Sequence, residues 1–385
     1  MVLTLAFRNL FHDRVRLIVT IVGILFSIVL VAVQLGLYFG ASKIIIAMIE
    51  RSDGELWVTA YGAKSFEESD VLSGRERYAA LSTPGVKDAI PVVAAFTRWK
   101  KSDGGAQLCV VVGTDAADNG LVPWNIVGGD VATIKLPDGV AVDRTYFENL
   151  GVSKLGDTAE INSERVRVTA ITEGIRSFTT TPYIFTTLDR ARSLLGMPAG
   201  SASHYLVQLR DGADPLVVQK ELQKRLPDQE VLTRAEFRDR SLEHWLFGTG
   251  AGVALIGGAL LGMIVGTVIV AQTLYSSTKD HLNEFATLRA LGSSSGYIHK
   301  VILAQAGLSA VIGYGLGMAI AIGIVALSQN SALPIVMTPT LAGILFALTL
   351  GMCAISAVSA IVKVTKIDPA MVFSRHAAQS PSRRP

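Results

Sequence analysis

Adjacent carboxylates at Glu67 and Glu68 are the residues of this 385-residue chain whose type and spacing come nearest to an acid–base pair. General acid–base catalysis needs titratable groups held within hydrogen-bond reach of a reacting bond. Neighbouring carboxylates on a protein surface are far more often solvated than catalytic, and we expect both side chains to face water. The pair therefore does not predict an active site.

Other catalytic patterns are missing from the sequence as well. It contains no phosphate-binding G-x-x-x-x-G-K-[ST] loop, no H-E-x-x-H zinc motif and no clustered Cys/His set. The chain has two cysteines, and we expect Cys109 to be a buried small hydrophobe. The histidines are scattered over unrelated segments, at positions 12, 204, 244, 281, 299 and 376. We expect this chain to have no catalytic residue and to bind no metal or cofactor of its own.

The composition is that of a membrane protein. Half of the residues (50%) are hydrophobic and only 17% are charged, and the mean hydropathy is +0.43. Crossing a hydrocarbon core takes about 20 apolar helical residues, and four stretches are long enough. The predicted spans are residues 17–39, 246–275, 301–327 and 341–362. The first is too long for a signal peptide and no small-x-small cleavage site ends it, so we expect it to be retained.

The distribution of charge predicts the orientation. Residues 1–16, 276–300 and 363–385 share one side of a four-span chain and hold 11 basic and 4 acidic residues. The remainder holds 24 basic and 28 acidic residues. Because cytoplasmic loops are enriched in Lys and Arg, we expect both termini in the cytoplasm. Residues 40–245 and the short loop 328–340 would then lie outside.

Residues 40–245 have the pattern of a mixed α/β domain. Alternating runs such as 156–174 predict strands, and amphipathic runs with short connections predict helices between them. We expect two lobes. Helical sequence at 41–54 and 234–248 predicts a stalk helix at each end of the domain. The predicted fold is four transmembrane α-helices, with a large mixed α/β extracytoplasmic domain inserted between helices 1 and 2.

The first 16 residues allow two interpretations. Apolar Leu5 and Phe7 alternate with basic Arg8 and Arg14 at roughly helical spacing. This pattern is typical of an amphipathic helix lying at the membrane interface. A simple basic flank of the first span is equally compatible with it.

Small residues follow one face of two predicted spans. Gly258, Gly262 and Gly266 recur every four residues, and Gly313 and Gly317 repeat the spacing. Such stripes let a neighbouring helix approach closely, so we predict helix packing at these glycines rather than a substrate path. No charged residue lies in the middle of a span, which disfavours a channel or an ion-coupled carrier. The polar exceptions, for which we expect hydrogen bonds between helices, are Gln34, Gln272 and Gln305.

The loop at 276–300 carries a helical pattern of its own. Gly292 and the serines after it would end this helix. Its apolar residues, at three- and four-residue steps, are Leu282, Phe285, Leu288 and Leu291. The helix is either a connector or a site for a cytoplasmic partner. A chain with a large outer domain and no energy source needs a protein to drive it, which favours the partner.

The run from Glu284 to Gly292, EFATLRALG, together with KIDPAMVF at 366–373, resembles the permease subunits of MacB/FtsX-type ABC transporters, most closely their DevC-like branch. The resemblance covers essentially the whole chain. It implies a homodimeric permease at the bacterial inner membrane, with two ABC ATPase subunits bound beneath it. We expect no ATPase domain fused to this chain, so the resemblance places ATP and Mg in a separate polypeptide.

In this family the loop helix is a coupling helix seated in a groove of the ATPase. The resemblance assigns that role to His281, Glu284, Phe285, Leu288, Arg289, Leu291 and Gly292. ATPase closure would push this helix and move the outer domain (mechanotransmission), without substrate crossing the bilayer core. The resemblance also implies a periplasmic adaptor, an outer-membrane channel and contact with membrane lipids, and no nucleic acid. The expected function is export of an amphiphilic, lipid-like or peptide substrate. The alternatives are an FtsX-like regulator that activates a periplasmic partner without transport, and a membrane receptor.

Overall fold

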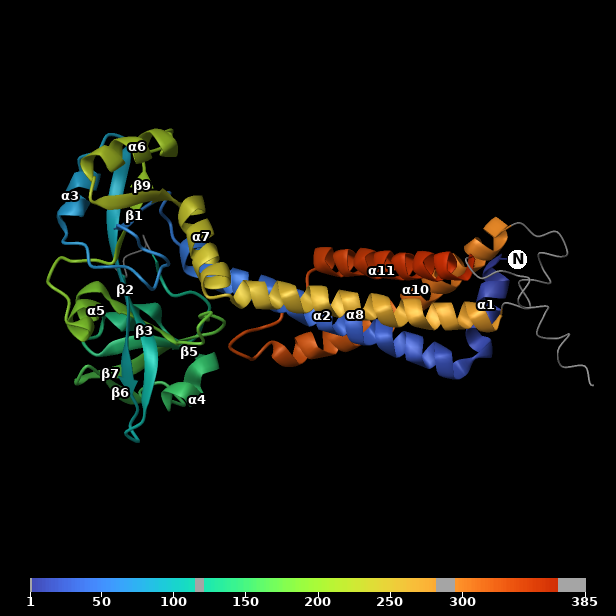
Figure 1. Ribbon diagram of the computed structural model, residues 1–385. Coiled ribbons are helices and arrows are strands. Elements are labelled where there is room, and N and C mark those ends of the chain that lie inside the picture. The colour runs from blue at the N-terminus through green and yellow to red at the C-terminus, as the bar shows by residue number, and fades with distance from the viewer. Residues whose placement is uncertain (1, 115–120, 282–294, 366–385) are drawn as a thin grey trace, which may run out of the picture. The chain divides into compact units, whose positions relative to one another are not determined.

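The computed structural model describes residues 2–114, 121–281 and 295–365 (Figure 1). The chain divides into two compact units. The membrane unit comprises Met1–Tyr38, Ala254–Gln329 and Ile335–Pro385, and the sheet unit comprises Phe39–Val253 and Asn330–Pro334.

Four helices within the described residues are long and apolar enough to cross a membrane, as predicted. They are α2 (Arg14–Glu50), α8 (Ala251–Asp280), α10 (Ser295–Ser328) and α11 (Pro339–Thr365). Each has a long uncharged run, and that of α2 extends from Leu17 to Ser42. When such a run is helical, its backbone N–H and C=O groups bond to one another within the helix, as a chain in lipid requires.

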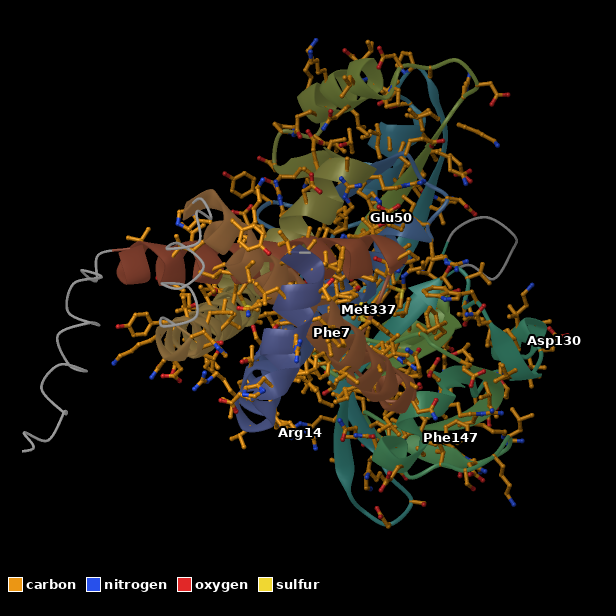
Figure 2. All side chains as sticks on the ribbon, turned by 90° about the vertical axis from the view of Figure 1, so that its right-hand side faces the viewer. Phe7, Arg14, Glu50, Asp130, Phe147 and Met337 are labelled. Atoms are coloured by element: carbon orange, nitrogen blue, oxygen red, sulfur yellow. The ribbon has the colours of Figure 1, made fainter. Side chains whose placement is uncertain are left out.

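A short helix, α1 (Val2–His12), precedes them. Leu3, Phe7 and Phe11 are four residues apart and exposed, whereas Ala6 is buried. Phe7 and Arg14 are labelled in Figure 2. The apolar stripe is the geometry of a helix that lies at a membrane interface. Helix α2 starts afresh after Asp13, whose Oδ1 accepts a hydrogen bond from the backbone N–H of Arg16 at 3.2 Å and so caps the helix N-terminus.

In the described part of the sheet unit, ten strands form the sheet (Figure 1). Their order is β10-β1-β9-β2-β3-β8-β5-β7-β4, with β6 paired to β2 and β7. The strands are β1 (Leu56–Ala60), β2 (Val86–Lys100), β3 (Ala106–Thr114), β4 (Ile126–Gly129), β5 (Gly139–Asp143), β6 (Thr158–Ile161), β7 (Glu164–Thr172), β8 (Tyr183–Thr187), β9 (His204–Leu209) and β10 (Gln229–Thr233). The helices are α3 (Arg75–Leu81), α4 (Phe147–Leu150), α5 (Leu188–Leu195), α6 (Pro215–Arg225) and α7 (Arg234–Leu242). Parallel and antiparallel pairs coexist, so the predicted mixed α/β domain is confirmed.

One long strand, β2, joins two lobes. Its first part pairs antiparallel with β9, from Val86 to Val92. Its second part pairs with β3, from Val93 to Lys100. The lobe around β3 is thus inserted between β2 and β9 of the other lobe, which explains why a single boundary between lobes cannot be found along the sequence. Apolar residues fill both lobes, and Cys109 is fully buried among them, as predicted.

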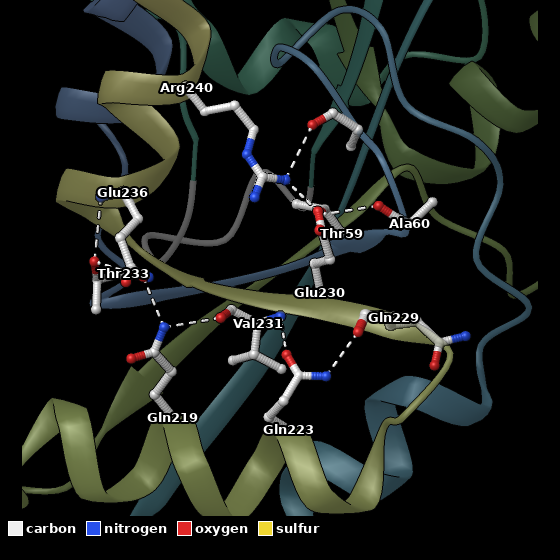
Figure 3. A network of polar contacts seen from close by, with 11 residues as sticks. Thr59, Ala60, Gln219, Gln223, Gln229, Glu230, Val231, Thr233, Glu236 and Arg240 are labelled. Carbon is white, nitrogen blue, oxygen red and sulfur yellow. Dashed lines mark hydrogen bonds and ion pairs between the residues drawn. The ribbon is translucent and has the colours of Figure 1, made fainter.

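The free edge of β10 is closed by side chains of α6 (Figure 3). Gln219 Nε2 donates to the carbonyl of Val231 at 2.9 Å, and the N–H of Val231 donates to Gln223 Oε1 at 2.9 Å. Gln223 Nε2 also donates to the carbonyl of Gln229 at 2.8 Å. Gln219 and Gln223 are one helical turn apart, so both face the strand. Exposed strand edges are templates for unwanted pairing, and these glutamines occupy this one.

His204 lies in an aromatic cluster in the core of the sheet unit. Its ring is 5.6 Å from that of Trp57, 5.7 Å from that of Phe66 and 5.4 Å from that of Phe237. Nε2 donates to the carbonyl of Phe66 at 2.9 Å, whereas Nδ1 has no hydrogen-bond partner within the described residues. Burial lowers the pKa of His204 to about 4, because the charged ring would lose its hydration.

The expectation that Glu67 faces water is wrong. Its side chain is buried, accepts a hydrogen bond from the hydroxyl of Tyr183, and accepts another from Ser65 Oγ at 3.0 Å. Burial, with the charge of Glu67, raises the pKa of Tyr183 well above its usual value. Glu68 is exposed, as expected, and lies 3.3 Å from His244. The two adjacent carboxylates therefore have different surroundings, which their sequence does not disclose.

The stalk helix predicted at 234–248 is not a single α-helix. Helix α7 ends at Leu242, and Glu243–Gly248 form a π-helix. Gly250 then adopts φ +79°, a left-handed conformation that ends the helical path before α8 begins. By contrast, the helical continuation predicted for 41–54 is present as far as Glu50, where α2 ends.

Candidate coupling site

The predicted ATPase-contacting residues lie at the boundary of the described chain. His281 directly follows α8 and is described. The other six, Glu284, Phe285, Leu288, Arg289, Leu291 and Gly292, lie outside the described residues. The structure therefore describes the base of this loop, which we define as Asp280 and His281 together with the ends of α1 and α2 that contact them.

An ion pair fixes the first side of this base. Arg16, in the first turn of α2, places a guanidinium nitrogen 2.5 Å from Oδ2 of Asp280, the last residue of α8. Asp13 Oδ2 lies 3.4 Å from the same guanidinium. Arg16 is largely shielded from solvent, with 23% of its side chain exposed. The start of α2 and the end of α8 are thereby tied together one residue before the predicted site begins.

His281 continues the last turn of α8. Its backbone N–H donates to the carbonyl of Ser277 at 3.2 Å. Its ring centroid lies 6.4 Å from that of His12 at the end of α1, in an edge-on arrangement. Three helices, α1, α2 and α8, therefore meet around residues 280 and 281.

A small polar cavity lies beside the ion pair. Its volume is about 20 Å³, enough for one water molecule, and Thr20, Gln305 and Ser309 are among the residues that line it. Gln305 is only 3% exposed. Ser309 Oγ is buried without a hydrogen-bond partner within the described residues. Polar groups thus gather in the interior of the membrane unit near the base of the loop.

The five glycines of the predicted packing stripes all face α2. A Cβ on Gly258 would lie 2.7 Å from Gln34 Nε2, one on Gly262 3.0 Å from Leu30 Cδ2, and one on Gly266 2.4 Å from Ser27 Oγ. On α10, a Cβ on Gly313 would lie 2.5 Å from Ile24 Cγ2 and one on Gly317 3.1 Å from Ile28 Cβ. Distances below 3.0 Å leave no room for a side chain. Ser27 Oγ also donates to the carbonyl of Gly262 at 2.8 Å. Side chains of α2 therefore pack directly against the glycine backbone of α8 and α10.

A second tie joins α2 to α7 within the sheet unit. Arg234 donates to the carbonyls of Ser52 and Gly54, at 3.0 and 2.8 Å. Arg238 lies 3.7 Å from the carboxylate of Glu50 at the end of α2. Helix α7 starts with a capping box in which Thr233 and Glu236 satisfy each other's backbone N–H groups, and these bonds lower the pKa of Glu236 against the effect of burial. The cap holds Arg234 and Arg238 in place.

Sequence reasoning predicts the glycine positions but not the two ties. Arg16 and Asp280 are 264 residues apart, so no local spacing indicates that they meet. The available signal is that both stand at the ends of long apolar runs on the same predicted side of the membrane.

Two family models match this chain. The MacB-like periplasmic core domain matches residues 17–225, which is more than half of the chain, and the FtsX-like permease C-terminal domain matches residues 256–369. Uncharacterized ABC transporter permeases of Mycobacterium tuberculosis and Mycobacterium bovis are 26% identical over 380 residues, which cover 96% of this chain and 98% of theirs.

Solved structures of low sequence identity are also similar. The periplasmic region of MacB from Actinobacillus actinomycetemcomitans is 11% identical with a TM-score of 0.37, over 50% of this chain and 94% of that one. The extracellular domain of the transporter YknZ from Gram-positive bacteria is 11% identical with a TM-score of 0.34, over 47% of this chain and 99% of that one. On the family-model matches and its four membrane-spanning helices, the chain belongs to the MacB/FtsX-type family of ABC transporter permeases, as a multi-pass membrane protein.

Proposed function

We propose that this permease couples nucleotide hydrolysis in a separate ATPase to movement of its sheet unit, and so exports an amphiphilic, lipid-like or peptide substrate. The loop at 281–292 is the point at which the ATPase acts. Both termini and this loop lie in the cytoplasm, and residues 40–245 lie outside the bacterial inner membrane.

The observation that carries this proposal is the anchoring of the loop's base. Asp280 is held by Arg16, so a push on the loop would act on the start of α2 as well as on the end of α8. Helix α2 is continuous over 37 residues, a length of about 55 Å at 1.5 Å per residue. Close glycine contacts with α8 and α10 support it along its membrane part. A braced helix of this kind is suited to carrying force.

The uncharged spans support the same mechanism. Charged groups within a bilayer mark the paths of ions and polar solutes, and none lies in the middle of a span. Transport in this proposal therefore uses motion outside the bilayer core. Two copies of the chain act together with two ATPase subunits, which bind ATP and Mg, and with a periplasmic adaptor and an outer-membrane channel.

Replacement of Glu284 by Lys tests the proposal. In the complex of the full chain with its ATPase, we expect E284K to reduce both co-purification of the ATPase and the rate of ATP hydrolysis, because a charge is reversed in the contact. Glu148→Lys, which makes the same change at an exposed residue of α4, is the matched control. Wild-type co-purification and hydrolysis in E284K would refute the assignment.

A further inference from the structure

A hollow of about 350 Å³ opens beside the end of α2 in the sheet unit. One wall is formed by the end of α2, with Lys43 and Ala47, and by Arg51 directly after the helix, at four-residue steps along the chain. The facing wall is formed by Trp124 and, from the connection between β7 and β8, Arg176. The volume falls within the range of pockets that bind small molecules.

Positive charge dominates this hollow. Lys43, Arg51 and Arg176 line it, and Glu50 is its one acidic residue. Glu50 lies 3.7 Å from Arg238 of α7, which partly neutralises it. Within the described residues, neither Lys43 nor Arg51 forms an ion pair. The hollow therefore favours an anion.

Arg51 is held in a geometry suited to binding. Its guanidinium carbon lies 5.4 Å from the centre of the Trp124 ring, a cation–π contact. Because no carboxylate among the described residues pairs with this guanidinium, its N–H groups can bind the paired oxygens of a phosphate. Ile44, Ala47 and the Trp124 ring supply apolar surface beside this charge. Charge and apolar surface together fit an amphiphile better than a free ion.

The position along α2 indicates the source of that amphiphile. Lys43 is one helical turn, about 6 Å, beyond Phe39, the last residue of the predicted first span. Basic side chains just beyond an apolar span lie at the depth of lipid headgroups, so Lys43 lies at that depth, and Arg51, about 12 Å farther along the chain, extends the hollow outward. We infer that this hollow binds the phosphate headgroup of an anionic lipid, with Arg51 and Lys43 on the phosphate and Trp124 against the apolar part. This inference rests on the proposed export function in one respect: it takes the exported amphiphile to be an anionic lipid.

Lipid binding by the full chain, purified in detergent without its ATPase, tests this inference. Native mass spectrometry would compare phosphatidylglycerol with phosphatidylcholine of the same acyl chains. We expect the anionic lipid to bind more tightly. In K43Q/R51Q its apparent Kd should rise roughly thirtyfold, since each cation beside an anionic lipid contributes about a fivefold factor. In W124A, which keeps every charge, it should rise severalfold.

The matched control is R75Q/K220Q, which removes the same charge from exposed residues of α3 and α6. It should bind as the wild type does. An equal loss in this control, unchanged binding in K43Q/R51Q, or displacement of the lipid by a tenfold excess of inorganic phosphate would overturn the inference. E284K should retain the lipid, because it changes only the ATPase contact. Lipid binding without any effect of E284K on hydrolysis would therefore refute the proposed function alone.

Discussion

Arg16 at the start of α2 and Asp280 at the end of α8 form an ion pair of 2.5 Å, immediately before the loop that the family resemblance assigns to the ATPase. Asp280 is half exposed, so solvent weakens the attraction, and pairs of this kind contribute about 0.2–1 kcal/mol to stability. The pair therefore contributes little to the free energy of unfolding. Its importance is that it connects α2 and α8 next to the predicted coupling loop.

Asp280→Asn should separate these two effects. We expect the thermal midpoint of the full chain in detergent to change little, and ATP hydrolysis by the assembled complex to fall severalfold. A double-mutant cycle with Arg16→Gln isolates the pair, because the double variant should be no worse than either single one. Additive losses would show that the two residues act separately.

Gly313 and Gly315 provide a matched test of helix packing on α10. A Cβ at Gly313 would lie 2.5 Å from Ile24, whereas one at Gly315 would have no neighbour within 4 Å among the described residues. We expect Gly313→Leu to destabilise the membrane unit by about 1–3 kcal/mol, the usual cost of overpacking. Gly315→Leu should be nearly neutral. Thermal unfolding in detergent and size-exclusion chromatography would measure both, and equal losses would contradict the packing geometry.

The glutamines on α6 predict a defect at the edge of the sheet. Gln219→Ala with Gln223→Ala removes the bonds to both polar groups of Val231. We expect a loss of about 1 kcal/mol for each hydrogen bond, and aggregation on mild heating because the edge of β10 is uncovered. Light scattering during a thermal ramp would detect this. Lys220→Ala, an exposed neighbour on the same helix, should not aggregate; if it does, the edge is not the cause.

His204 predicts a pH dependence of the sheet unit. Its pKa is about 4 in the folded chain and about 6.5 when unfolded, so the unfolded chain takes up the proton first. The contribution of neutral His204 to stability is therefore fully present above pH 6.5. Protonation of the unfolded chain lowers the free energy of unfolding by about 3 kcal/mol as the pH drops toward 4. Hydrogen exchange of peptides covering β1 and β9, corrected for the intrinsic effect of pH, would follow it. The decline should be absent in His204→Gln, and its persistence there would assign it to other groups.

The membrane helices and the mixed sheet could be predicted because their signals are local. An uncharged run such as that of α2 can only be buried or cross a bilayer, and alternating residues such as those of β7 predict a strand in any context. The spacing of the glycine stripes is a local signal of the same kind. The sequence does not reveal that Glu67 is buried, because its partner Tyr183 is 116 residues away. The π-helix at Glu243–Gly248 has the composition of an ordinary helix, so the sequence predicts only a helix there. Long-range partners and backbone irregularities of this kind are decided by tertiary packing.

Strand β2 also limits how this protein can be cut into pieces for study. Because its 15 residues serve both lobes, a recombinant fragment ending inside β2 would leave each half with an incomplete sheet. A fragment that holds only residues 101–203 would lack the strand on which β3 is aligned. Crystallographers and protein engineers who want either lobe must therefore express both, and a graft from a relative should exchange the pair as one piece.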